Sequence, residues 1–140
     1  MLLLDVNVWV ALTFDTHPSH PSAKAWFDPL TGQICHFCRM TQQGFLRLAT
    51  NPKAVGLNAL TLDEAWIAYD AFLGDPRVAF APEPAGLEVH WRTFTKASTT
   101  SPHVWNDAYL AAFALAGGLE VITFDRGFTK FPSVRSTILP

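Results

Sequence analysis

Short apolar runs alternate along the chain with longer segments in which apolar residues recur every three or four positions. The runs are typical of buried strands, and the longer segments are typical of helices with one buried face. The pattern predicts strands over 2–5, 33–37, 77–80, 120–124 and 134–139. It predicts helices over 7–14, 20–28, 39–50, 61–73, 86–97 and 106–116. Strands separated by helices indicate an α/β fold with a mostly parallel sheet covered on both faces.

Several helix ends carry signals of their own. Thr61 and Glu64 have the spacing of a capping box, and Gly117-Gly118 is expected to end the helix over 106–116. Asn51-Pro52 is expected to stop the helix over 39–50. Because the Gly- and Pro-containing stretches are short turns, residues 1–140 are expected to form a single domain.

Composition narrows the class of protein. Hydrophobic residues make up 49% of the chain and charged residues 16%, which is typical of a globular domain. The net charge is −2, whereas proteins that coat nucleic acids generally are strongly basic. An enzyme with an acidic site is compatible with this charge. No apolar run approaches the ~20 residues of a membrane helix. The apolar N-terminus lacks a basic region and contains Asp5, unlike a signal peptide, so we expect a cytoplasmic protein.

Three aspartates stand where an apolar run meets a different kind of segment. Asp5 closes MLLLD, Asp107 opens NDAYLAAFALAGG, and Asp125 follows EVITF. A carboxylate at the carboxyl end of a buried strand, or in the first turn of a helix, lies at the rim where open α/β sheets bind ligands. Converging carboxylates repel one another unless a cation lies between them. The sequence therefore predicts a divalent-metal site made of these three acids.

Each acid also has an ordinary structural explanation. Asp5 suits the N-cap of the helix over 7–14, Asp107 suits the first turn of its helix, and Asp125 suits a turn after a strand. Asn7 follows Asp5 closely, and Thr123 projects to the same side of its strand as Asp125. We expect Asn7 and Thr123 to support the carboxylates.

The two cysteines, Cys35 and Cys38, form a CxxC, and His17 and His20 form an HxxH upstream. A structural zinc site or a redox pair is one interpretation of these spacings. It is disfavoured because Cys35 lies in a strand-like run, where positions three apart face opposite sides. Buried structural thiols are the preferred interpretation.

Four segments of the chain resemble, in order and spacing, the PIN-domain nucleases and specifically the toxins of the VapC type from bacterial toxin–antitoxin pairs. These segments are LLLDVNVWVAL, HPSHPSAKAWF, CRMTQQGFLRLATNP and VWNDAYLAAFALAGGLEVITFDRGF. The resemblance implies a three-layer α/β/α sandwich and metal-dependent cleavage of RNA. It also implies that metal-activated water attacks the phosphodiester and leaves a 5′-phosphate and a 3′-hydroxyl. Carboxylate oxygens suit Mg²⁺, with Mn²⁺ as a substitute, so Asp5, Asp107 and Asp125 are the expected ligands.

One position departs from the family pattern. The central helix of the family usually carries a fourth acid two residues before the glycine, and here Gln42 occupies that position in TQQGFLR. A glutamine can ligate a cation through its oxygen or position a bound water, but it cannot act as a general base. Gln42 is therefore kept among the expected catalytic residues, with weaker metal binding as the consequence.

Partners follow from the same resemblance. Arg126, beside Asp125, is the best candidate for contact with the RNA backbone, followed by Arg39 and Arg47. A homodimer inhibited by a cognate antitoxin is implied. The helices over 39–50 and 61–73 are expected to form the shared groove, with Trp66 and Phe72 as anchors. An arginine of the antitoxin would pair with the three acids and displace the metal.

Two other functions are compatible with the residues. The missing acid at Gln42 favours a PIN-fold binding module of low or no catalytic activity. A Mg²⁺-dependent phosphohydrolase of small phosphate esters would use the same three acids. Cleavage of RNA separates the nuclease from both alternatives.

Overall fold

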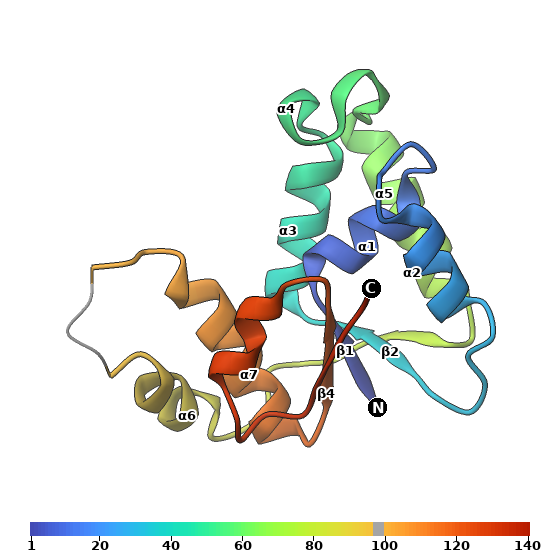
Figure 1. The fold of residues 1–140 in the computed structure, drawn as a ribbon. Coiled ribbons are helices and arrows are strands. Elements are labelled where there is room, and N and C mark those ends of the chain that lie inside the picture. The colour runs from blue at the N-terminus through green and yellow to red at the C-terminus, as the bar shows by residue number, and fades with distance from the viewer. Residues whose placement is uncertain (97–99) are drawn as a thin grey trace.

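The computed structural model describes residues 1–96 and 100–140 and contains one five-stranded parallel sheet (Figure 1). The strands are β1 (Leu2–Leu4), β2 (Cys35–Phe37), β3 (Val78–Phe80), β4 (Glu120–Thr123) and β5 (Ser136–Ile138). Their order across the sheet is β3-β2-β1-β4-β5, and every neighbouring pair is parallel. All five predicted strands are present. The sheet is fully parallel, so the expected mostly parallel α/β architecture is confirmed.

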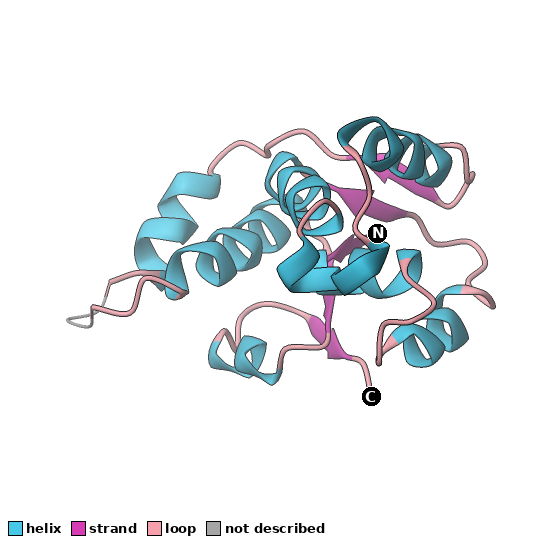
Figure 2. Ribbon diagram, turned by 90° about the horizontal axis from the view of Figure 1, so that it is seen from above, coloured by secondary structure: helices cyan, strands magenta, loops and turns pink. Residues whose placement is uncertain are grey.

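Helices cover both faces of this sheet (Figures 1 and 2). One face is covered by α1 (Val6–Thr13), α2 (His20–Phe27), α3 (Arg39–Ala49) and α5 (Leu62–Leu73). The other face is covered by α6 (Leu87–Phe94) and α7 (Val104–Gly117). Shorter elements are α4 (Pro52–Val55) and the 3-10 turns Gly56–Asn58 and Arg126–Lys130. The arrangement is the expected three-layer sandwich.

Alternate strand residues supply the two halves of the core. Leu2 and Leu4 of β1 belong to the cluster under α1, α3 and α5, whereas Leu3 belongs to the cluster under α7. Trp9 of α1 stacks on Phe37 of β2 with ring centroids 3.8 Å apart, and both rings are fully buried. Because successive strand side chains point to opposite faces, these apolar runs bury both sides of the sheet. The packing fixes α1 directly beyond the carboxyl end of β1.

Helix boundaries agree with the sequence in part. The Thr61–Glu64 capping box is present, and Gly118 follows α7 with a φ of 65°, a conformation that favours glycine. The helix predicted over 86–97 ends at Phe94, and position 97 lies outside the described residues. Helix α7 begins at Val104, two residues before the predicted start.

Helix α4 is a difference with a physical reason. Asn51 and Pro52 stop α3 as expected, but Asn51 also accepts a hydrogen bond from the backbone nitrogen of Lys53 at 3.0 Å. Asparagine at the N-cap followed by proline at the first helical position favours the start of a helix as well as the end of one. The same pair therefore ends α3 and begins α4.

Cys35 and Cys38 are free and buried thiols. Burial raises the pKa of Cys35 to about 12, so its thiol stays protonated near neutral pH. Among the described residues, no helix is long and apolar enough to cross a membrane.

Candidate active site

Asp5 lies between β1 and α1 and has the N-cap role considered for it. Its Oδ1 accepts a hydrogen bond from the Val6 backbone nitrogen at 2.7 Å, which caps α1. Its Oδ2 accepts hydrogen bonds from Asn7 Nδ2 at 2.9 Å and from the Thr123 hydroxyl at 2.6 Å. The capping contact orients the carboxylate, and the other two contacts tie it to the neighbouring strand.

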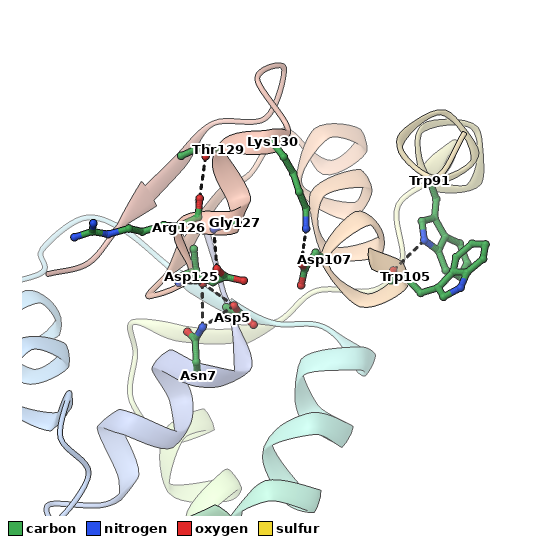
Figure 3. Close-up of polar contacts among 11 residues, drawn as sticks. Asp5, Asn7, Trp91, Trp105, Asp107, Asp125, Arg126, Gly127, Thr129 and Lys130 are labelled. Carbon is green, nitrogen blue, oxygen red and sulfur yellow. Dashed lines mark hydrogen bonds and ion pairs between the residues drawn. The ribbon is translucent and has the colours of Figure 1, made fainter. Parts of the chain in front are cut away.

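Thr123, the last residue of β4, joins the carboxyl ends of two adjacent strands. Its Oγ donates to Asp5 and accepts from Asn7 Nδ2 at 3.1 Å and from the Asp125 backbone nitrogen at 3.0 Å. Asn7 also accepts from the Phe124 backbone nitrogen at 3.3 Å. Parallel pairing of β1 with β4 brings these residues together from positions more than a hundred apart in sequence. Asn7 and Thr123 thus both contact the Asp5 carboxylate, and Figure 3 shows Asn7 beside Asp5.

Asp125 follows Thr123 by two residues and begins the Arg126–Lys130 turn. Its Oδ1 accepts a hydrogen bond from the Gly127 backbone nitrogen at 2.7 Å (Figure 3). The contact is the turn role considered for this residue. It also orients the carboxylate toward the rim of the sheet beside Asp5.

The three acids interact electrostatically. Burial is the largest influence on Asp5 and raises the pKa of its carboxyl. The hydrogen bonds from Thr123 and Val6 lower that pKa, whereas the negative charges of Asp107 and Asp125 raise it. Asp5 after β1, Asp107 in α7 and Asp125 after β4 therefore influence one another's charge, and a cation near them would favour their ionised forms.

Asp107, in the first turn of α7, has a partner that the sequence did not reveal. Its Oδ2 accepts a hydrogen bond from Lys130 Nζ at 2.8 Å (Figure 3). The ammonium also lies 5.2 Å from the centroid of the Phe131 ring. Lys130 ends a short turn with no periodic pattern, so only the tertiary fold brings it to α7.

A cavity of about 420 Å³ opens beside these acids, between α1, α3 and α7. It is lined by Asp5, Val6, Met40, Gln43, Gly44, Arg47, Leu48, Asn106, Asp107 and Leu110. A Cβ on Gly44 would come within 2.6 Å of a methyl carbon of Val6. Glycine in the middle of α3 therefore lets this helix approach α1 closely and close one wall of the cavity.

Gln42 does not lie where the sequence analysis expected it. The residue is only 6% exposed, and its side-chain oxygen accepts a hydrogen bond from Arg39. Among the described residues lining the cavity, α3 supplies Gln43 and not Gln42. The reason is rotational: consecutive helical residues are about 100° apart, and the cavity face of α3 carries Met40, Gln43, Gly44 and Arg47.

The arginines proposed for RNA contact lie in different surroundings. Arg47 lines the cavity. Arg39 contacts Gln42 and lies 4.8 Å from the centroid of the Phe80 ring. The exposed Arg126 side chain points away from the acids (Figure 3). Arg47 is therefore the best placed of the three.

The donor set fits a hard divalent cation in its chemistry, since carboxylate oxygens are the preferred ligands of such ions. No described residue donates a hydrogen bond to Asp125 Oδ2 or to Asp107 Oδ1. However, no three of the described His, Cys, Asp and Glu side chains are grouped closely enough to hold a metal ion together. The ammonium of Lys130 lies on Asp107 instead. Metal binding at all three acids thus requires side-chain adjustment that includes Lys130.

Comparison with known proteins identifies the family. A model of the PIN domain matches residues 2–134. The chain belongs to the PIN domain family. It is 46% identical over 144 residues to ribonuclease VapC41 of Mycobacterium tuberculosis, covering 99% of both chains. Ribonuclease VapC31 of the same organism is 33% identical, with 96% of both chains covered. The VapC-type resemblance is confirmed by these relatives.

Solved structures agree on the fold. The crystal structure of VapC20 from Mycobacterium tuberculosis has a TM-score of 0.68 at 18% identity and covers 92% of this chain and 93% of its own. VapBC2 from Rickettsia felis, bound to a DNA fragment from its promoter, has a TM-score of 0.71 at 15% identity, with 99% and 98% covered. At such identities the likeness shows the fold alone.

Replacing Thr123 by valine tests the network around Asp5. Valine keeps the shape but removes the hydroxyl that donates to Asp5 and accepts from Asn7 and Asp125. We expect divalent-metal affinity to fall about 10–100-fold, the usual consequence of losing a group that orients a ligand. Isothermal titration with Mn²⁺ measures it. Thr93→Val, which removes an exposed hydroxyl on α6, should leave the affinity unchanged; equal affinities in both variants would contradict the supporting role.

Replacing Lys130 by methionine tests the competition at Asp107. Loss of one positive charge in contact with the site should tighten Mn²⁺ binding about tenfold. Lys130→Arg keeps the charge and should bind as the wild type does. Arg126→Met removes a cation of the same turn that points away from the acids, and should change the affinity much less. If Arg126→Met and Lys130→Met tighten binding equally, the effect is general charge and not the contact with Asp107.

Proposed function

We propose that this PIN domain is a metal-dependent endoribonuclease and the toxin of a toxin–antitoxin pair. The observation that carries the proposal is the acidic cavity. It is lined by Asp5 and Asp107, which are far apart in sequence, and by Arg47. The full-length similarity to proteins named ribonuclease supports the same reaction. An acidic recess with a cation at its edge suits a phosphodiester held near a bound metal ion.

Mg²⁺ or Mn²⁺ held by Asp5, Asp107 and Asp125 would supply a water of lowered pKa and would neutralise charge on the scissile phosphate. The chain's own residues prepare this chemistry. Thr123 and Asn7 orient the Asp5 carboxylate, and the Gly127 nitrogen orients that of Asp125. Arg47 is positioned to hold a phosphate, and Lys130, once released from Asp107, is a second cation for the RNA.

The partner surface is proposed to be the groove between α3 and α5. A recess of about 340 Å³ there is lined by Gln43, Leu46, Arg47, Thr50, Leu62, Ala65 and Trp66. Gln43 and Arg47 line this groove and the acidic cavity alike, so the two recesses lie side by side along α3. Leu62, Trp66 and Ile67 expose 73%, 48% and 67% of their surface on α5. Exposed apolar side chains gathered on one helix are typical of a protein interface.

Trp66 and Phe72 were both expected to anchor this groove, but only Trp66 lies on it. Trp66 lines the groove, whereas Phe72 packs inward against Trp9, with centroids 5.0 Å apart, and against Phe45. Trp66 alone is the proposed anchor. A cognate antitoxin along this groove would reach the acids, and a homodimer built on α3 and α5 is part of the same proposal.

Asp5→Asn and Asp107→Asn test the nuclease. Each variant removes one negative charge from the proposed metal site, so we expect both to lose RNA cleavage and growth inhibition while keeping the fold. Cleavage of a labelled RNA with and without Mg²⁺ is measured beside circular dichroism of each variant. Full Mg²⁺-dependent activity of a folded Asp5→Asn protein would contradict the assignment. Activity of the wild type on a chromogenic phosphoester but not on RNA would favour a small-molecule phosphohydrolase.

Trp66→Ala tests the partner groove. Truncating a half-exposed anchor should weaken binding of the cognate antitoxin about thirtyfold, a change typical of an interface hot spot. Val89→Ala, which truncates an exposed apolar residue on α6, is the matched control and should not weaken it. Inhibition should also decline as Mg²⁺ rises, because an antitoxin arginine and the metal compete for the same acids. A flat Mg²⁺ dependence would mean that the antitoxin acts only by covering the groove.

A further inference from the structure

A second cavity, of about 470 Å³, lies on the opposite side of α7 from the acids. Its aromatic walls are Trp91 of α6 and Trp105 and Tyr109 of α7. Trp105 is 55% exposed, an unusual degree for so large an apolar side chain. The cavity therefore presents aromatic surface to solvent two residues before Asp107.

Trp105 is held in place by its neighbour. The Trp91 indole nitrogen donates a hydrogen bond to the Trp105 backbone oxygen at 3.1 Å, and the two rings meet edge-to-face with centroids 6.0 Å apart (Figure 3). Trp91 also meets Tyr109 edge-to-face, with centroids 5.2 Å apart. Trp91 therefore packs against both aromatic residues of α7, and the exposed ring of Trp105 offers a flat surface on which a ligand can stack.

The charges around this cavity indicate a neutral ligand. Two acids, Glu83 and Glu88, and two bases, Arg92 and Lys96, line it, so their formal charges balance. Arg92 pairs with Glu88, and Glu83 accepts a hydrogen bond from the Tyr109 hydroxyl at 2.7 Å. A phosphate gains little from such a balanced rim, whereas a flat, uncharged ring gains from the aromatic walls. Every nucleobase has that chemistry.

We propose that Trp105 and Trp91 form a stacking site for an unpaired nucleobase of the RNA whose backbone enters the acidic cavity. The inference rests on the proposed nuclease function and adds an aromatic subsite for one base of the substrate. Helix α7 provides the continuity, since Asn106 and Asp107 line the acidic cavity and Trp105 and Tyr109 line the aromatic one. A helix is about 10–12 Å across, so a strand that crosses the start of α7 could present its backbone to one cavity and a nearby base to the other.

Trp105→Ala tests this site in RNA binding, separately from cleavage. Asp5→Asn protein is titrated with a short fluorescent single-stranded RNA and with the same sequence as a duplex. In that background Trp105→Ala should weaken single-strand binding about tenfold or more, the usual contribution of one base–aromatic stack. Trp105→Phe should restore most of the affinity. Duplex binding should change little, because paired bases cannot leave their stack without cost.

A strand with one abasic position, moved along the sequence, supplies the second measurement. At one position the missing base should weaken binding as much as Trp105→Ala does, and the two changes together should weaken it no further. Val89→Ala controls for truncation of an exposed apolar residue on the adjacent helix. Equal single-strand affinities of the parent and Trp105→Ala proteins would overturn the inference. So would a loss of antitoxin binding in Trp105→Ala with RNA binding retained, since a protein partner would then occupy the cavity.

The two levels of the proposal fail in different ways. A wild-type protein that cleaves no RNA overturns the nuclease function, and the binding series still decides whether Trp105 holds a base. A wild-type protein that cleaves RNA, with Trp105→Ala equal to its parent in binding, overturns the stacking site alone.

Discussion

Keeping a partly buried carboxylate at the carboxyl end of β1 constrains much of the surrounding structure. Burial raises the pKa of Asp5, and hydrogen bonds from Thr123 and Val6 oppose that effect, while Asn7 donates a third hydrogen bond to the carboxylate. One donor requires α1 to begin at once after β1, and another requires β4 to lie beside β1 in the observed register. A shift of one residue in that pairing would turn the Thr123 hydroxyl to the other face of the sheet. The register and the helix start are thus set by the site as much as by the core.

Two features of α1 and α3 are unfavourable for the stability of the fold. The indole nitrogen of Trp9 is buried without a hydrogen-bond partner among the described residues, and Gly44 in the middle of α3 lowers the intrinsic stability of that helix. Stacking of Trp9 on Phe37 and the close approach of α3 to α1 accompany these costs. The close approach of α3 to α1 at Gly44 closes one wall of the acidic cavity. A glycine in the middle of a helix thus stands where the chemistry is proposed, and such local exceptions are usual at functional sites.

How far sequence alone reaches is clear from particular residues. Parallel strands end at one edge of a sheet, so the proximity of Asp5 and Thr123 followed from strand order once β1 and β4 were adjacent. Which of Gln42 and Gln43 faces the cavity could not be predicted from the sequence. Two identical neighbouring residues differ in no property that would indicate the rotation of α3. Lys130 was invisible for another reason: its contact with Asp107 joins a short turn to a distant helix and leaves no periodic trace. Helix existence was predictable, whereas rotation and tertiary ion pairs required the structure.

Helix α7 shows how one rigid element can serve two sites. Its alanines at 108, 111, 112 and 114 are buried, and such small side chains let the helix lie close to the sheet. That packing fixes the rotation of α7, so Asp107 lies on the cavity that Asp5 lines, whereas Trp105 lies on the cavity beside α6. A side chain on a packed helix holds its position more accurately than one on a loop. The spacing between an acid that would help hold a metal ion and a ring that would hold a base is therefore set by helical geometry. RNA flexible enough to follow that spacing would be favoured over a regular duplex, whose bases stay stacked.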